Sequence, residues 1–395
     1  MGVRAGVVAA VAVVLLAGCD GGGGTTSPLL SPTGRPARTS AAAPAPSASA
    51  ASPSGATPSA APARGTATVT GTVATHLSTP WGVAQLPDGA LLVASRDSGR
   101  ISRVDPDKGT VAEVGSVPGV SHPQGGEGGL LGLAVSPDFG SDQMVYAYFT
   151  TESDNRIARM IYDPSRPAGE QLGAPDTIVR DIPSGTLHNG GRIAFGPDGM
   201  LYAGTGETGN RSLAQNMSSL GGKILRMTPD GQPPQDNPFP GSLVYSLGHR
   251  NVQGLAWDPA GHLWASEFGQ DKWDELNLIE PGKNYGWPVV EGIAHNPAYV
   301  DPVAQWPTDQ ASPSGIAYAA GSIWMAALKG ERLWRIPLNG THTAAPPQAF
   351  FTHTYGRLRT VVALDDHTLL LTTSNTDGRG TPKPGDDRLL RVSVS

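Results

Sequence analysis

The sequence has one cysteine among 395 residues, which excludes a framework of intrachain disulfide bonds and a metal centre built from several thiolates. It also lacks an excess of basic residues, because the formal net charge is −6 and the isoelectric point is about 5.8. Proteins that bind nucleic acid in general carry a strong basic excess. General nucleic-acid binding is therefore not expected.

Glycine and proline, in contrast, are abundant, with 52 and 36 residues. Long helices tolerate few residues of either type, so a helix-rich fold is not expected. The glycines follow no three-residue period, which excludes a collagen-like triple helix. The composition instead indicates a fold with many turns and loops.

The first residues have the pattern of a secretory signal. Arg4 precedes an apolar run over residues 5–16, which is too short to span a membrane comfortably, and small residues then lead to Cys19. Residues 1–18 therefore predict a bacterial lipoprotein signal, with lipidated Cys19 as the mature N-terminus on the outer face of the plasma membrane. The alternative is an ordinary signal peptide in which Cys19 is incidental.

A segment of low complexity follows this signal. Residues 19–64 are mostly Ala, Ser, Pro, Gly and Thr, and they lack the apolar side chains that offset the entropy lost on ordering a chain. We predict a disordered tether over residues 19–64 and a folded domain over residues 65–395.

One sequence pattern recurs in the folded domain. Each copy has alternating apolar residues, a turn of the Pro-Asp-Gly type, and a second apolar strand, which together predict a β-hairpin. The last two copies are degenerate. The six copies occupy residues 81–94, 131–149, 191–203, 253–265, 314–326 and 359–371.

A third strand is predicted after each hairpin, and the six candidates begin at residues 99, 155, 222, 274, 331 and 387. A unit of about 55 residues suits one propeller blade with long loops. Residues 67–76 alternate in the same way and precede the first copy, so we expect them to complete the last blade. The prediction is an all-β, six-bladed β-propeller of four-stranded antiparallel blades. A β-sandwich, the competing architecture, would not need six matched units.

The phase of the repeat also predicts where a site would lie. The first strand of each blade lines the axis, so residues just before it gather at one axial mouth, and the end of the second strand returns to that mouth. Alignment of the copies on the alanines at 84, 134, 194, 256 and 317 and on Val362 places several polar side chains there. They are Glu127, His188, Arg250, Asn251, Gln253, Lys329, Arg357, Arg359 and residues 267–271.

Four of these side chains, Arg250, Lys329, Arg357 and Arg359, are cationic. Their mutual repulsion in one concave site is costly unless an anion offsets it, and arginine suits carboxylate recognition. A small polycarboxylate is the ligand that this set favours. His188 is the obvious general base, since imidazole titrates near neutral pH. The alternative is that these are surface hairpin residues paired with local Asp or Glu.

Several segments together resemble the glucose/sorbosone dehydrogenase family, the soluble sugar dehydrogenases that use pyrroloquinoline quinone (PQQ). The resemblance covers essentially the whole folded domain. It rests on residues 127–134, 188–199, 221–226, 247–256, 282–288, 313–315, 327–330 and 386–391.

The resemblance implies an activity and roles for individual residues. His188 would take the proton from the anomeric hydroxyl of an aldose while hydride passes from the anomeric carbon to the quinone, which gives a lactone. Arg250 would polarise the quinone carbonyl. The main-chain carbonyls of Gly269 and Gln270 would bind calcium, which prefers oxygen ligands. The residues implied in cofactor binding are Glu127, Arg250, Asn251, Gln253, Lys329, Arg357 and Arg359, with Asp274 as a further candidate.

The chain departs from the family pattern at Glu127, where glutamine is usual. A carboxylate beside an anionic cofactor would be repelled, so Glu127 requires protonation or a cationic neighbour. Two other functions stay open. A lactonase-type propeller hydrolase would want acidic side chains around an axial metal, and a non-catalytic propeller would bind a ligand without redox activity. The expected partners are an aldose, an electron acceptor and, through Cys19, the membrane.

Overall fold

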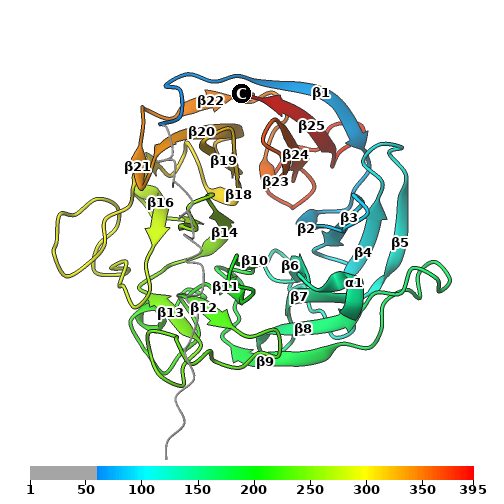
Figure 1. The fold of residues 1–395 in the computed structure, drawn as a ribbon, viewed down its shortest axis with the longest axis horizontal. Helices are drawn as coiled ribbons and strands as arrows, with labels where there is room; N and C mark the ends of the chain where they lie inside the picture. The colour runs from blue at the N-terminus through cyan, green and yellow to red at the C-terminus, as the bar shows by residue number, and fades with distance from the viewer. Residues whose placement is uncertain (1–59) are drawn as a thin grey trace, which may run out of the picture. The chain divides into compact units, whose positions relative to one another are not determined.

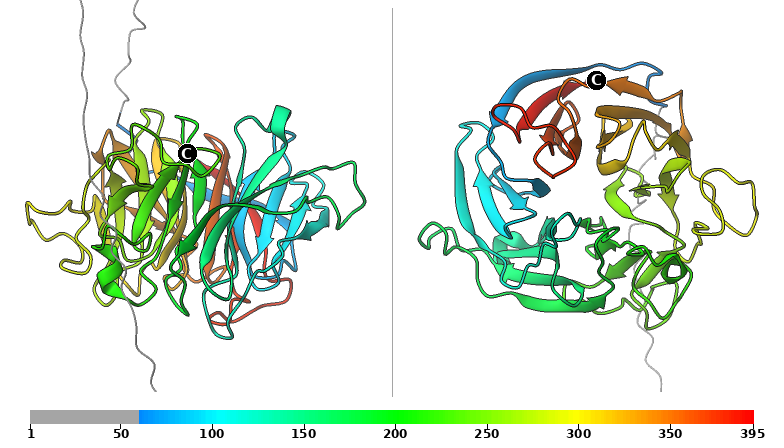
Figure 2. Two further views of the ribbon diagram at one scale, coloured as in Figure 1. Left: turned by 90° about the horizontal axis from the view of Figure 1, so that it is seen from below. Right: turned by 180° about the vertical axis from the view of Figure 1, so that it is seen from behind.

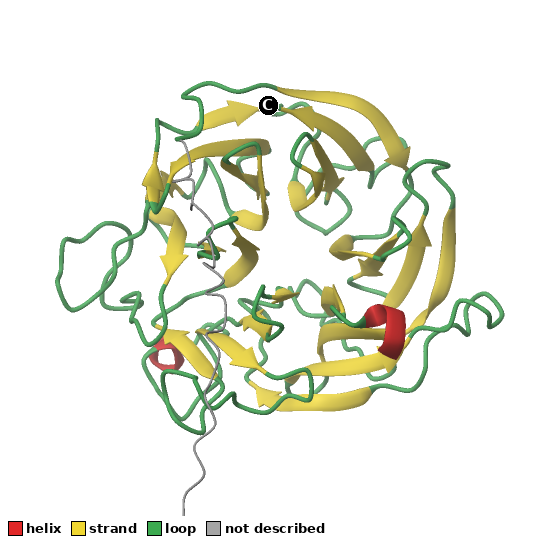
Figure 3. Ribbon diagram, viewed as in Figure 1, coloured by secondary structure: helices red, strands yellow, loops and turns green. Residues whose placement is uncertain are grey.

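The computed structural model describes residues 60–395. The predicted signal at residues 1–18, Cys19 and residues 19–59 of the predicted tether lie outside the described residues. In the described part of the chain, the longest helices have four residues, and no helix is long and apolar enough to cross a membrane. Figure 3 shows how completely strands and loops dominate this part of the protein.

The described residues form six antiparallel sheets arranged as blades around a ring, which confirms the predicted six-bladed propeller (Figure 1). In every blade the innermost strand carries the repeat position used for alignment, so the phase of the pattern predicted the position of the axis. Figure 2 shows the ring edge-on, with loops leaving both ends of the strands.

The first three blades use consecutive strands. Blade 1 contains β2 (Pro80–Gln85), β3 (Leu91–Ser95), β4 (Arg100–Val104) and β5 (Val111–Ser116). Blade 2 contains β6 (Leu130–Val135), β7 (Met144–Thr150), β8 (Asn155–Ile161) and β9 (Asp176–Ile182), with α1 (Phe139–Asp142) in the first hairpin. Blade 3 contains β10 (Ile193–Phe195), β11 (Leu201–Gly204), β12 (Lys223–Met227) and β13 (Val244–Leu247), with the 3₁₀ helix η1 (Arg211–Ala214) after β11.

The next two blades follow the same order from the axis outward. Blade 4 contains β14 (Val252–Trp257), β15 (Leu263–Glu267), β16 (Trp273–Ile279) and β17 (Ala304–Pro307). Blade 5 contains β18 (Pro313–Ala319), β19 (Ser322–Ala327) and β20 (Arg332–Asn339), and both β21 (His342–Thr343) and β22 (Gln348–Phe350) pair with β20.

Blade 6 closes the ring with strands from both ends of the domain. It contains β23 (Leu358–Asp365), β24 (Thr368–Thr373) and β25 (Leu389–Val394), and its outer strand is β1 (Ala67–Ala74). β1 pairs antiparallel with β25 from Ala67 opposite Val394 to Ala74 opposite Leu389. The predicted closing strand is therefore confirmed, and its hydrogen bonds join the first residues of the domain to the last.

The hydrophobic core lies between the blades. The buried apolar side chains fall into six clusters, and each cluster lies mainly between two neighbouring blades. The alternation of the strands produces this arrangement, because successive side chains point to opposite faces of a sheet and so toward two different neighbours.

Glycine in the innermost strands allows the blades to approach closely near the axis. A Cβ at Gly82 would meet the carbonyl oxygen of Leu131 in the next blade, and a Cβ at Gly132 would meet the carbonyl oxygen of Gly191. The glycine that leads most copies of the repeat is therefore explained by backbone contact between adjacent blades.

The described residues begin shortly before the predicted domain boundary at residue 65. The amide of Ala61 donates to the carbonyl of Leu338 at 2.8 Å, and the guanidinium of Arg335 donates to the carbonyl of Pro62 at 3.0 Å. Arg335 is fully buried and needs such acceptors. Ala61 and Pro62, at the end of the predicted tether, therefore pack on blade 5.

Candidate active site

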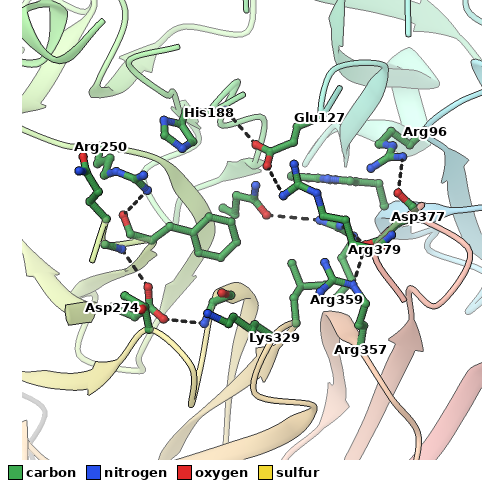
Figure 4. A pocket seen from close by; sticks show the side chains of 18 residues that line it. Arg96, Glu127, His188, Arg250, Asp274, Lys329, Arg357, Arg359, Asp377 and Arg379 are labelled. Atoms are coloured by element: carbon green, nitrogen blue, oxygen red, sulfur yellow. Dashed lines mark hydrogen bonds and ion pairs between the residues drawn. The ribbon is translucent and has the colours of Figure 1, made fainter. Parts of the chain in front are cut away.

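One axial mouth of the propeller contains a cavity of about 390 Å³. Residues from all six blades line it, and Figure 4 shows their side chains converging on the same space. Its charged walls carry six cations and three carboxylates, so the cavity is strongly positive although the whole chain is acidic. The cations are Arg96, Arg250, Lys329, Arg357, Arg359 and Arg379, and the carboxylates are Glu127, Asp274 and Asp377.

The structure brings most of the predicted site residues to this cavity, including the four cations that the repeat phase placed at one mouth. Glu267 and Asp271 at the ends of the predicted segment 267–271 do not line the cavity, and neither does Asn251. It is fully buried and lies behind the wall, where its Oδ1 accepts the amide N–H of Gly190 at 2.9 Å. The predicted residues that line the cavity are Glu127, His188, Arg250, Gln253, Gly269, Gln270, Asp274, Lys329, Arg357 and Arg359.

His188 is held at two points. Its Nδ1 lies 2.5 Å from Oε1 of Glu207, a carboxylate that is 1% exposed, and its backbone N–H donates to Oε2 of Glu127 at 2.9 Å. Because Nδ1 faces a buried carboxylate, it carries the proton, and Nε2 is the nitrogen free to accept another. His188 therefore has the tautomer that a general base needs.

Arg250 enters the cavity from the segment just before β14. Its backbone N–H donates to Glu267, and its Nη1 lies 3.4 Å from the carbonyl oxygen of Phe268. The guanidinium lies 5.5 Å from the ring centroid of Trp287, at cation–π distance. Burial lowers the pKa of Arg250, and its Nε has no hydrogen-bond partner among the described residues. This desolvated cation has donors available for a ligand.

The neighbouring His249 has a structural role. It is fully buried, its Nδ1 lies 2.8 Å from Glu267, and its Nε2 lies 2.8 Å from Ser246. Its ring stacks on Tyr285. Glu267 therefore orients the backbone of Arg250 and the ring of His249 together, and His249 faces no part of the cavity.

One buried carboxylate organises the cations of blade 6. Oδ2 of Asp377 lies 3.0 Å from Nε of Arg357 and 3.2 Å from Nη2 of Arg359. Burial acts to raise the pKa of Asp377, but Arg359 and Arg357 outweigh it and hold that pKa below its usual range. Burial lowers the pKa of Arg359 to about 10. Two guanidiniums share one carboxylate, so this wall keeps a net positive charge.

The loop between β15 and β16 lines the cavity with Gly269 and Gln270. The N–H of Gly269 donates to Asp274 at 2.9 Å, and the N–H of Gln270 donates to Glu291 at 2.7 Å. Burial raises the pKa of Asp274 to about 7. The carbonyl oxygens of Gly269 and Gln270 accept no hydrogen bond from residues 60–395, which leaves them free for a cation.

Sequence reasoning missed several residues of the site. Among them are Trp81, Arg96, Glu207, Asp377 and Arg379. A signal for three of them existed, because Arg96, Glu207 and Asp377 follow β3, β11 and β24, and second strands end at the predicted mouth. The same rule had identified Lys329 after β19, and it needed only to be applied to every blade.

Comparison with known proteins places the chain in a family. The family model described as glucose/sorbosone dehydrogenase matches residues 77–390. Quinoprotein glucose dehydrogenase B of Acinetobacter calcoaceticus is 34% identical over 259 residues, which are 58% of this chain and 54% of that protein. Aldose sugar dehydrogenase YliI of Escherichia coli K12 is 34% identical over 224 residues, which are 54% of this chain and 60% of that protein. Both alignments span less than two thirds of the relative.

A solved structure covers more of the chain. The PQQ-bound form of an aldose sugar dehydrogenase from Streptomyces coelicolor is 66% identical, with a TM-score of 0.84, and the match covers 85% of this chain and all of that one. The apo form of the soluble aldose sugar dehydrogenase from E. coli is 26% identical, with a TM-score of 0.69. With the family model matched over most of the propeller, this chain belongs to the glucose/sorbosone dehydrogenase family.

Proposed function

We propose that this protein is a PQQ-dependent aldose dehydrogenase that oxidises the anomeric carbon of a sugar to a lactone. The observation that carries the proposal is the cavity with six cations and three carboxylates, with His188 on its wall. The 66% identity to an aldose sugar dehydrogenase solved in its PQQ-bound form supports the same assignment.

The residues present fit an anionic quinone. PQQ carries carboxylates, and Arg250, Lys329, Arg357 and Arg359 would hold them by charge-assisted hydrogen bonds. Arg250 and Lys329 make no ion pair with a carboxylate among the described residues, so their charges are available to a ligand. When bound, the quinone supplies a two-electron acceptor for the hydride that leaves the sugar.

His188 would act as the general base. Its Nε2 accepts the proton of the anomeric hydroxyl as the C–H bond of that carbon breaks, and the resulting C=O bond completes the lactone. Glu207 keeps the proton on Nδ1 and stabilises the imidazolium that forms, since the two side chains are 2.5 Å apart. Arg250 would stabilise negative charge on oxygen within the cavity.

Calcium is the metal that we propose for the loop between β15 and β16. The free carbonyl oxygens of Gly269 and Gln270 are hard ligands of the kind that calcium prefers. Residues 60–395 contain no group of three or more His, Cys, Asp or Glu side chains suited to hold a metal. Main-chain carbonyls and the bound ligand would therefore supply much of the coordination.

The same finding argues against the hydrolase alternative. A lactonase-type propeller needs an axial metal held by acidic side chains. In this mouth the cationic side chains outnumber the acidic ones, six to three. A non-catalytic binding propeller would not need a buried Glu207 to set the tautomer of His188. The geometry therefore favours the dehydrogenase over both.

We also propose that the enzyme works outside the cytoplasm, anchored through lipid on Cys19. The support is the sequence of residues 1–19 alone. Metabolic labelling with radioactive palmitate should mark the wild-type protein and fail to mark Cys19→Ala. Label retained by Cys19→Ala would contradict the anchor.

The activity is tested with the purified protein, calcium and PQQ. Reduction of a dye is followed with a panel of aldoses, and bound quinone is measured by its absorbance after gel filtration. We expect quinone retained by the protein and turnover with at least one aldose. A protein that retains no quinone and shows no turnover would defeat the proposal. Retention of quinone without turnover would favour a binding propeller.

A further inference from the structure

Two charged side chains from opposite ends of the domain meet at the rim of the cavity. Nη1 of Arg379 lies 2.7 Å from Oε1 of Glu127 although the residues are 252 positions apart. Glu127 precedes β6 of blade 2, and Arg379 lies in the loop between β24 and β25 of blade 6. Both line the cavity, and Figure 4 shows the ion pair of Glu127 with Arg379, which lies between His188 on one side and Arg357 and Arg359 on the other.

The second oxygen of Glu127 contacts the proposed base. Oε2 accepts the backbone N–H of His188 at 2.9 Å. His188 has a φ of +53°, in the left-handed region that residues other than glycine rarely adopt. A carboxylate at position 127 therefore supports an uncommon backbone conformation, in addition to bringing negative charge into the cavity.

That charge opposes the electrostatics of the rest of the site. The side chain of Glu127 is 16% exposed, so solvent screens it weakly from an anion in the same cavity. The side chain of Arg379 is 49% exposed, and its backbone N–H donates to Oδ1 of Asp377 at 3.0 Å. The carboxylate that anchors Arg357 and Arg359 thus also holds the loop that carries Arg379.

We propose that Arg379 is a positioning residue that compensates the charge of Glu127, so that this carboxylate can hold the His188 backbone without repelling an anionic ligand. The inference rests on the proposed function, because PQQ is the anion concerned. It predicts that the effect of Arg379 on anion affinity depends on the charge at position 127. Arg379 would not itself contact the ligand.

A double-mutant cycle tests this dependence. Arg379→Gln, Glu127→Gln and the double variant are compared with the wild type, since glutamine at 127 keeps an acceptor for the His188 N–H and removes the charge. The Kd for PQQ is measured by quenching of tryptophan fluorescence in buffer with calcium. Arg103→Gln breaks an ion pair with Asp88 of similar length, 2.7 Å, outside the cavity and serves as the matched control.

Arg379→Gln should weaken PQQ binding about tenfold, and the double variant should return to within about threefold of the wild type. Arg103→Gln should leave the Kd unchanged. If the double variant loses as much affinity for PQQ as Arg379→Gln does, the proposal is overturned, because Arg379 would then bind the anion directly. An unchanged Kd in Arg379→Gln would overturn it as well. The melting temperature of each apo protein reports any loss of folding separately.

Citrate provides a probe that does not depend on the quinone. The same variants are titrated with citrate in calcium-free buffer, and the gain in melting temperature reports binding to the folded state. Arg379→Gln should reduce the gain and the double variant should restore it. A wild type that binds citrate but not PQQ would defeat the proposed function alone, whereas failure of the double variant to restore citrate binding would defeat the charge compensation.

Discussion

The loops at the two ends of the blades differ in how regular their sequences are and in the charges that they carry. At one end the Pro-Asp-Gly-type turns join the two inner strands, and the cavity there, about 280 Å³, is lined mostly by residues of apolar type, with Arg192 as its one charged lining residue. At the other end the loops differ from blade to blade and bring together six cations and three carboxylates. Residues that repeat build the ring, and residues that do not repeat build the site.

A single strand pair in blade 4 shows the same contrast. Near the turn, Leu263 of β15 lies opposite Ile279 of β16, an apolar pair that favours the sheet. At the mouth, Glu267 lies opposite Glu275, and both carboxylates are buried. Burial and the charge of Glu267 raise the pKa of Glu275, so the fold accepts a local electrostatic cost at the end where Glu267 orients Arg250 and His249.

The largest predicted effect compares one histidine from each end. His188→Gln should lower kcat by about 10²–10⁴-fold, because a general base contributes about that much. His262 lies at a turn, with its Nδ1 2.8 Å from Asp258, and His262→Gln should leave kcat unchanged. Dye-reduction kinetics of the loaded enzymes measure both. If His188→Gln keeps more than a tenth of the wild-type kcat, the proposed catalytic difference between the histidine in the cavity and the histidine at the turn is contradicted.

The second comparison concerns ion pairs. Asp377 is 1% exposed, and Asp377→Asn should lower the free energy of unfolding by about 3–5 kcal/mol, because two buried guanidiniums lose their carboxylate. Asp88 pairs with Arg103 near a turn and is 58% exposed, so Asp88→Asn should cost about 0–1 kcal/mol. Denaturant unfolding measures both variants. Equal losses would show that burial at the mouth does not matter.

The third comparison is in the pH dependence of stability. Burial raises the pKa of Glu275, and the charge of Glu267 raises it further. The folded state therefore holds this proton more tightly than the unfolded state, and stability falls as pH rises above the ordinary glutamate range. Glu275→Gln should make the melting temperature of the apo protein less dependent on pH between 5 and 8.

Asp365 at a turn provides the control for that profile. Its pKa is lowered, first by the hydrogen bond from the His367 N–H, so its titration is complete below pH 5. Asp365→Asn should leave the slope between pH 5 and 8 as in the wild type. A Glu275→Gln variant with the wild-type slope would contradict the assignment of that slope to the mouth.

The smallest predicted effect is at a hairpin turn. Gly199 has a φ of +73°, and an added Cβ would meet no atom within 4 Å. Gly199→Ala should therefore lower stability by about 1 kcal/mol through backbone strain alone, with unchanged kcat. Thermal unfolding and dye reduction measure the two quantities. A loss of kcat would show that the turn end communicates with the site.

Much of the fold and part of the site could be predicted because both follow from periodicity. The alternation of apolar residues identified the hairpins, and the phase of the alternation placed His188, Arg250 and Lys329 at one mouth. Asn251 shows the limit of that argument, because phase places a residue at the mouth without stating whether its side chain faces the cavity. Residue 379 lies in a long loop outside the repeat, so no phase applied to it.

The sequence by itself determined the number of blades, the closing strand β1 and the gathering of cations at one end, since these depend on local pattern and circular repetition. The tertiary structure alone decided the partners, which are Glu127 with Arg379, Asp377 with Arg357 and Arg359, and His188 with Glu207. The physical reason is that an ion pair needs atoms within a few ångströms, and closure of the ring brings such loops together from opposite ends of the chain.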